Sequence, residues 1–294
     1  MTEKPLLVII GEAHPPGIEQ AFEMSGRIKT KTKEVRGVKR LVIDSSKEPE
    51  RSAANLRRIN EEIIKREALI LREEKVTRLF YEEPANAERK KLYAEFKKTH
   101  DLAHLKAGLR KEMCRMDAQL MKDIDRLLVE IDLWEPLLEG ARAMMRKSER
   151  AQHMLSVSPA SVAHRAGIFE IAPFEDELLH RKATALIECW GILKHASNWL
   201  LDAPEAADIR KKYGGEIDKK IGFEIFCSTQ AIKERKQDIH EERERAACRN
   251  ILEDYVPGSA VICGLLHADS LGKLLAKKFR VKVYLVGREL GEVR

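Results

Sequence analysis

The stretch Leu6–His14, LLVIIGEAH, carries the pattern on which the predicted fold depends. Its aliphatic run leads directly into Gly11, and Glu12 and His14 follow. An aliphatic run that ends at a glycine is typical of a buried α/β strand, and such sheets place their ligands at the carboxyl ends of their strands. A second copy of the pattern, Ser259–His267 (SAVICGLLH), stands near the other end of the chain. We therefore predict that the two ends of the chain lie together in one sheet.

Further segments carry strand patterns. Residues 40–44 and 76–81 are apolar runs that end at or beside acidic residues, and residues 281–286 form another apolar run. Between the first two runs, apolar residues recur close to a helical period over residues 52–74. The basic segment 30–36 is predicted to be a loop. This alternation predicts an α/β fold with a central sheet that is mixed or parallel.

The middle of the chain has a different composition. Helix-forming residues dominate it, residues 156–173 are loop-like in their Ser, Pro and Gly content, and a long charged helix is expected over about 216–255. We therefore predict an α/β core of residues 1–90 and 256–294, which carries the functional site. Residues 91–255 are predicted to form a large helical insertion that packs on this core or caps it.

Charge and composition limit the classes of function. The net charge is +6, and 54 basic residues are interleaved with 48 acidic ones. This small surplus, together with an aromatic content of only 5%, does not favour a nucleic-acid-binding surface. The charged helices are instead expected to be solvated, and they offer surfaces through which a homo-oligomer could form.

The sequence also predicts a location in the cell. No stretch approaches the roughly 20 apolar residues that span a bilayer, and the N-terminal pattern does not fit a signal peptide. The five cysteines are scattered without a CxxC spacing. They are interpreted as reduced and mostly buried thiols, which is typical of a reducing compartment. We therefore expect a cytoplasmic protein without a membrane partner.

Two histidines, His14 and His267, have positions that favour chemistry. Each stands three residues after a strand-end glycine, at the edge where open α/β sheets bind ligands. Carboxylates are expected at the same edge: Glu12, Asp44, and Glu82 or Glu83. Two imidazoles with one or two carboxylates form a divalent metal site that leaves room for a water, and the metal lowers the pKa of that water.

These residues also have structural interpretations. A single strand-end histidine is more often a hydrogen-bonded structural residue, Glu82 and Glu83 fit an exposed turn, and Asp44 fits a helix cap. The histidines of the helical middle are interpreted as solvated or interhelical residues: His100, His104, His153, His164, His180, His195 and His240. The chain carries no P-loop, GxGxxG or GxSxG motif, which leaves nucleotide binding and serine hydrolysis without support.

Taken together, the strand-end motifs resemble those of the TraB/Tiki, ChaN and erythromycin-esterase superfamily. The motifs are Ile9–His14 (IIGEAH), Leu79–Glu83 (LFYEE) and Val261–His267 (VICGLLH). In order and spacing they are similar to the two Gly-x-x-His motifs of that group and the strand-end glutamate between them. The resemblance implies an α/β core with a helical insertion. It implies metal-dependent peptide cleavage if the Tiki branch applies, and ester-ring hydrolysis or haem binding if other branches do.

The same resemblance implies a set of site residues. The catalytic residues would be Glu12, His14, Glu82, Glu83 and His267. Among them His14, Glu82 and His267 would hold a divalent Mn, Co or Zn ion, and Glu12 would accept the proton of the attacking water. The resemblance matches Arg89 with the arginine that follows the glutamate in the family. In the predicted hydrolase, Arg89 or Arg243 would bind an anionic group of the substrate.

The expected function is thus the hydrolysis of a peptide or ester bond in a peptide or small-molecule substrate. The alternative is a protein of the same fold without catalysis, which binds haem or another small molecule or serves as a scaffold. The sequence leaves open which of Glu82 and Glu83 faces the site.

Overall fold

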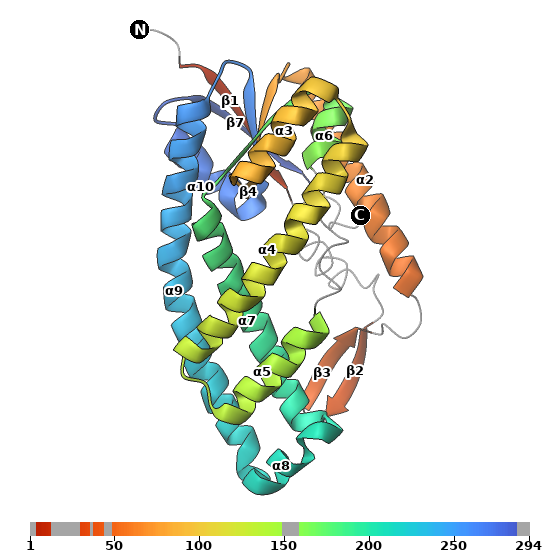
Figure 1. The fold of residues 1–294 in the computed structure, drawn as a ribbon, viewed down its shortest axis with the longest axis vertical. Coiled ribbons are helices and arrows are strands. Elements are labelled where there is room, and N and C mark those ends of the chain that lie inside the picture. The colour runs from red at the N-terminus through yellow and green to blue at the C-terminus, as the bar shows by residue number, and fades with distance from the viewer. Residues whose placement is uncertain (1–3, 13–29, 36–37, 44–48, 149–158, 287–294) are drawn as a thin grey trace.

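The computed structural model describes residues 4–12, 30–35, 38–43, 49–148 and 159–286 (Figure 1). A five-stranded parallel sheet is the centre of the fold, with the strand order β5-β4-β6-β1-β7. Its strands are β1 Leu6–Glu12, β4 Arg78–Pro84, β5 Glu170–Glu175, β6 Ser259–Gly264 and β7 Arg280–Val286. β1 pairs directly with β6, with Ile9 opposite Val261. The predicted α/β fold, with both ends of the chain in one sheet, is confirmed, and the sheet is parallel.

Two segments near the N-terminus differ from the prediction. Residues 30–36, predicted as a loop, contain strand β2 Thr30–Val35, which pairs antiparallel with β3 Val38–Ile43 in a separate two-stranded sheet. The alternation of threonine and lysine in β2 has the period of a strand. The apolar run at 40–44 therefore contributes to this hairpin and not to the central sheet, and Asp44 lies outside the described residues.

The segment 156–173 also differs, because it contains regular structure. It holds helix α6 Pro159–Ala166 and most of β5, which lies beside β4. β5 includes Pro173, and a proline is tolerated there because β5 is an edge strand of the sheet. The middle of the chain thus contributes one strand to the central sheet.

Long helices make up the rest of the described chain. Before the middle region comes α2 Pro49–Glu73, and after it comes α10 Leu265–Leu275. The middle region holds α3 Ala87–Thr99, α4 Leu102–Glu130, α5 Glu135–Ser148, α7 Glu177–Asp202, α8 Ala207–Tyr213 and α9 Ile217–Asp254. Two short 3-10 turns, Pro204–Ala206 and Gly214–Glu216, flank α8. The long charged helix predicted over 216–255 corresponds to α9.

Helices cover both faces of the central sheet. On what we call the first face, Ile63 of α2 and Phe96 of α3 are buried with Ile10 of β1. On the second face, Leu271 of α10 is buried with Phe80 of β4, and α9 joins the same cluster. Parts of α4, α5, α7 and α9 form a separate apolar core. These helices extend away from the sheet toward α8 (Figure 1).

The described helices and the cysteines bear on two further predictions. None of the described helices combines the length and the apolar character that a membrane span requires. The five cysteines are all unpaired, as predicted. However, Cys114 and Cys227 are exposed, because each lies on the outer side of a charged helix, so the thiols are not mostly buried.

Gly11 lies at the point where α10 crosses β1. A Cβ atom at this position would lie 2.8 Å from the Cβ of Ala268 and 3.0 Å from Cδ2 of Leu285. The glycine therefore permits a close approach between the helix and the sheet. That approach brings the first turn of α10, which contains His267, to the carboxyl edge of the sheet.

Replacement of Gly11 by alanine is expected to lower the free energy of unfolding by about 1–3 kcal/mol, because the added methyl group overpacks this contact. Gly272→Ala is the matched control. Its new Cβ would meet Val283 at an ordinary 3.5 Å, and alanine favours the helix, so this variant should be as stable as the parent or more stable. Urea unfolding followed by circular dichroism measures both. A Gly11→Ala protein as stable as the parent would contradict this account.

Candidate metal centre

The two glutamates near the end of β4 belong to opposite faces of the sheet. Successive side chains of a strand alternate between faces, and here Tyr81 is buried in the first-face cluster while Phe80 is buried in the second-face cluster. Glu83 accordingly lies on the first face and Glu82 on the second. The Oε1 atom of Glu82 is 3.5 Å from Nε2 of His267. Glu82 is therefore the glutamate that accompanies His267.

The carboxylate of Glu82 is held by groups from three elements. Its Oε2 accepts a hydrogen bond from the backbone N–H of Gly264, the last residue of β6. Its Oε1 lies 3.3 Å from Nη2 of Arg243 in α9, and His267 of α10 approaches the same oxygen. The sheet edge and both helices of the second face therefore converge on this side chain.

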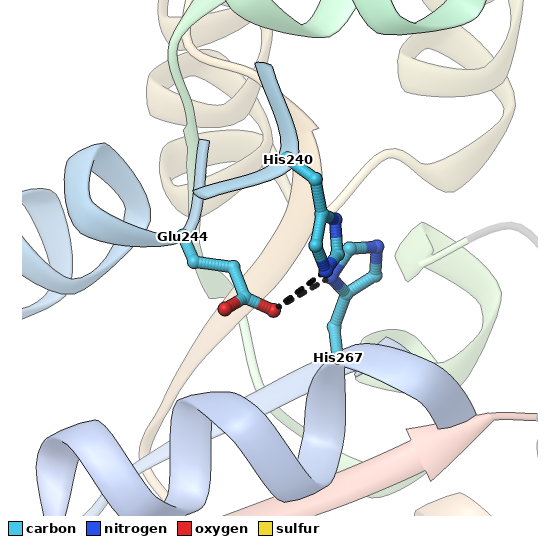
Figure 2. A group of neighbouring side chains, drawn as sticks. All are labelled: His240, Glu244 and His267. Carbon is cyan, nitrogen blue, oxygen red and sulfur yellow. Dashed lines mark ion pairs between the residues drawn. The ribbon is translucent and has the colours of Figure 1, made fainter. Parts of the chain in front are cut away.

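On its other side His267 meets two residues of α9 (Figure 2). Its Nδ1 atom is 3.5 Å from Oε1 of Glu244, and Nε2 of His240 is 3.2 Å from the same oxygen. One ligand atom from each of these residues lies within 4.8 Å of the others. His240 and Glu244 are four residues apart, so they share one face of the helix. Ser270 donates a hydrogen bond to Glu244 and holds the carboxylate in place.

The donor set and its spacing fit a divalent transition metal. Two imidazoles and one carboxylate form a known ligand set of catalytic zinc, with a fourth position left for water. Tetrahedral ligands about 2.1 Å from a metal are about 3.4 Å from one another. The separations of 3.2 and 3.5 Å between Glu244 and the two histidines match that value, and the ligand atoms of the two histidines lie within 4.8 Å of each other. Glu82 lies next to Nε2 of His267, which is where a carboxylate that orients a metal-binding imidazole is usually found.

Solvent reaches this cluster on the side of His240. The His240 side chain is 43% exposed, whereas those of His267 and Glu244 are 18% and 14% exposed. The cavity that touches Glu82, Arg243, Glu244 and His267 measures only about 10 Å³. The ligand atoms are therefore packed closely together, and His240 is the most exposed of the three residues.

A partly buried ion-pair network lies beside the cluster. Arg243 joins Glu82 to Glu175, the last residue of β5, and Glu175 also contacts His180 of α7. Burial acts against ionisation of Glu175, but the contacts with His180 and Arg243 outweigh it and lower its pKa. Glu175 also lines a larger cavity of about 540 Å³, between the start of α7 and the C-terminal part of α9.

The first face of the same edge holds a separate acidic pair. Glu12 is buried and accepts a hydrogen bond from the hydroxyl of Tyr81 at 3.0 Å. Burial raises the pKa of Glu12 to about 7. The hydrogen bond from Tyr81 acts in the opposite direction, and the charge of Glu82 adds to the effect of burial. Glu67 of α2 is fully buried, and neither of its carboxylate oxygens has a hydrogen-bond partner among the described residues. Burial, and then the charge of Glu12, raise the pKa of Glu67 well above its usual value.

Arg89 and Glu83 form a network of their own on the first face. Arg89 is buried, pairs with Glu83 at 3.6 Å and contacts Glu112 of α4. Tyr93 donates a hydrogen bond to Glu83, and Asn86, which caps α3, donates one to Glu112. These contacts tie α3 to β4 and α4, on the opposite face from His267.

The structure therefore divides the residues predicted from the sequence. Glu82, His267 and Arg243 lie together on the second face. Glu12, Glu83 and Arg89 lie on the first face. His14 and Asp44 lie outside the described residues. The sequence interpretation missed Glu244 and counted His240 among solvated or interhelical histidines. Their spacing of four residues within a predicted helix was the available signal.

Comparison with known proteins adds no assignment. No family model matches the chain, and neither a curated protein nor a solved structure matches it. The site is therefore interpreted from its own geometry.

Replacement of Glu67 by glutamine is expected to flatten the pH dependence of stability. Because the folded state raises the pKa of Glu67 and Glu12 above 4.5, it keeps protons that the unfolded chain releases. The free energy of unfolding therefore falls as the pH rises from about 4.5 through 7. Glutamine cannot ionise, so at alkaline pH, with a chelator present, the variant should be more stable than the parent by about 1 kcal/mol or more.

Urea titrations at mildly acidic and mildly alkaline pH measure this difference. Glu73→Gln, an exposed change on the same helix, is the control and should leave the pH dependence unaltered. A Glu67→Gln protein with the slope of the parent would show that the buried carboxyl group does not govern stability in this range.

Proposed function

We propose that the protein is a metal-dependent hydrolase that cleaves a peptide or ester bond. The observation that carries the proposal is the convergence of His240, Glu244 and His267 within 4.8 Å at the carboxyl edge of a parallel sheet. These residues would hold Zn, Mn or Co, ions that accept imidazole and carboxylate ligands. Such a metal, when bound, lowers the pKa of a coordinated water and supplies hydroxide near neutral pH.

The surrounding residues would orient the ligands and supply charge. Glu82 beside Nε2 of His267 leaves Nδ1 directed toward Glu244 and His240. Ser270 fixes the carboxylate of Glu244. Arg243 brings a positive charge to the same edge, where it would stabilise the negative charge that develops on the oxygen of the attacked carbonyl group.

The large cavity is the space that we assign to the substrate. Its volume of about 540 Å³ lies within the usual range of small-molecule sites, about 300–1,000 Å³. Glu175 lines both this cavity and the small one at His267. A peptide or small molecule in the large cavity would therefore approach the metal centre past Glu175 and Arg243.

The resemblance of the strand-end motifs also supports the proposal. The strand-end motifs resemble a superfamily in which one branch cleaves peptides with a metal and another hydrolyses an ester ring. The proposed ligand set differs from the one that the resemblance implies, because His240 and Glu244 of α9 join His267 while Glu82 orients it.

Haem binding has less support, since the cavity at His267 measures about 10 Å³. Unpaired cysteines support a cytoplasmic location.

Alanine at His240 or His267 is expected to remove most of the bound metal, because each change deletes one ligand of the set. After loading with Zn²⁺ or Mn²⁺ and dialysis, elemental analysis should show metal in the parent and at most about a tenth of it in either variant. Cleavage of a peptide and ester panel should fall about 100-fold or more. His104→Ala, a change at an exposed histidine of α4, is the control.

Each outcome of this experiment has a distinct meaning. Equal metal content in the parent and both variants would refute the metal site. Metal that binds in the parent and is lost in the variants, without cleavage of any substrate, would instead favour the non-catalytic alternative.

Replacement of Arg243 by lysine tests the role of the guanidinium group. Lysine keeps the charge but cannot bridge Glu82 and Glu175 in the same planar geometry. We expect unchanged metal content and a kcat lower by about 10–100-fold. Arg245→Lys, an exposed change on the same helix, is the matched control. An unaltered kcat in Arg243→Lys would exclude a role for Arg243 in the reaction.

A further inference from the structure

We propose that Glu12 and Glu67 form a second cation site, for a hard divalent ion such as Mg²⁺ or Mn²⁺. Its donors come from the carboxyl end of β1 and from α2, on the first face of the sheet. The cluster of His240, Glu244 and His267 lies on the second face, so the second site does not depend on the proposed hydrolase function.

The first argument is the distribution of charge at this edge. Each of two arginines joins two glutamates: the partly buried Arg243 joins Glu82 to Glu175, and the buried Arg89 joins Glu83 to Glu112. Within the described part of the chain, no cationic side chain forms an ion pair with Glu12 or Glu67. A buried carboxylate without a counter-ion is costly, and a like charge beside it adds to the cost. A divalent ion would offset both charges.

The second argument is the hydrogen-bonding state of Glu67. Its side chain is fully buried, and among the described residues neither oxygen has a partner. Buried polar atoms in folded proteins nearly always have one. A carboxylate in this state points to a ligand that supplies the missing interactions. A metal ion would be coordinated by the lone pairs of the carboxylate oxygens, and its positive charge would offset their negative charge.

The third argument places the two carboxylates together. Burial and then the charge of Glu12 raise the pKa of Glu67, and after burial the charges of both residues raise the pKa of Tyr81. Ile63, one helical turn before Glu67 on α2, is buried in the first-face cluster together with Ile10 and Tyr81, so α2 presents Glu67 to the side of the sheet on which Glu12 lies. Tyr81 donates its hydroxyl proton to Oε2 of Glu12, which fixes the orientation of that carboxylate.

The donor atoms select the class of ion. Glu12 and Glu67 offer only carboxylate oxygens, which favour Mg²⁺, Ca²⁺ and Mn²⁺ over the softer ions that prefer imidazole. The second-face cluster offers two imidazole nitrogens and a carboxylate oxygen, a set suited to zinc. The two sites should therefore differ in the metals that they retain.

Thermal unfolding separates the second site from the first. In a His240→Ala/His267→Ala double variant, which lacks two ligands of the second-face cluster, Mn²⁺ or Mg²⁺ at alkaline pH should still raise the Tm. We expect a rise of about 3–8 °C at about 100 times the dissociation constant. Adding Glu67→Gln to this variant should abolish the rise, whereas adding the exposed change Glu73→Gln should preserve it.

A direct count of bound ions gives a second test that does not need the histidine variants. Equilibrium dialysis against Mn²⁺ should show one ion per chain fewer in Glu67→Gln than in the parent. Glu67→Gln is not expected to unfold, because the amide removes a buried charge. A Tm that does not respond to either ion, a response that persists in the triple variant with Glu67→Gln, or equal Mn²⁺ counts would overturn the proposal.

Discussion

Parallel strand pairing is the constraint on which both candidate sites depend. It brings the carboxyl ends of β1, β4, β5 and β6 to one edge of the sheet, where Glu12 stands opposite Gly264 in the ladder and the N–H of Gly264 binds Glu82. Side-chain alternation then divides the acidic residues of this edge between two faces. A shift of β4 by one residue would exchange Glu82 with Glu83 and place the wrong carboxylate beside His267. Register and chemistry are therefore inseparable at this edge.

On each face of the described sheet an arginine joins two glutamates, and these two arginines, Arg243 and Arg89, limit what can change around the sites. Buried ion pairs contribute little net stability, but removal of one partner leaves an uncompensated charge that costs about 3–5 kcal/mol. Arg243 and Arg89 therefore fix the positions of the carboxylates that they join. Glu12 and Glu67 lack such a partner among the described residues, which is why their chemistry differs from that of the other carboxylates.

The sequence predicted the central sheet well, because continuous aliphatic runs such as those of β1 and β6 are typical of strands buried on both faces. It did not predict β5, since Pro173 is unfavourable in a strand unless that strand is at an edge, and edge position is a tertiary property.

The site was predicted in part. Glu82 and His267 follow strands and could be placed by that pattern, whereas His240 and Glu244 depend on how far along the sheet α9 packs. No local pattern specifies that distance.

Helix α9 shows how an apolar stripe becomes a site. Its residues His240, Glu244, Ala247 and Ile251 are spaced by four, three and four positions, so they follow one face of the helix. Ala247 and Ile251 are buried against the sheet in the second-face cluster. Where the same stripe passes the carboxyl edge, apolar partners end and the first turn of α10 begins, and the stripe continues with an imidazole and a carboxylate. Polar residues at positions where the helical period calls for apolar ones are thus the physical sign of this candidate centre, because only a ligand or a facing polar group offsets their partial burial.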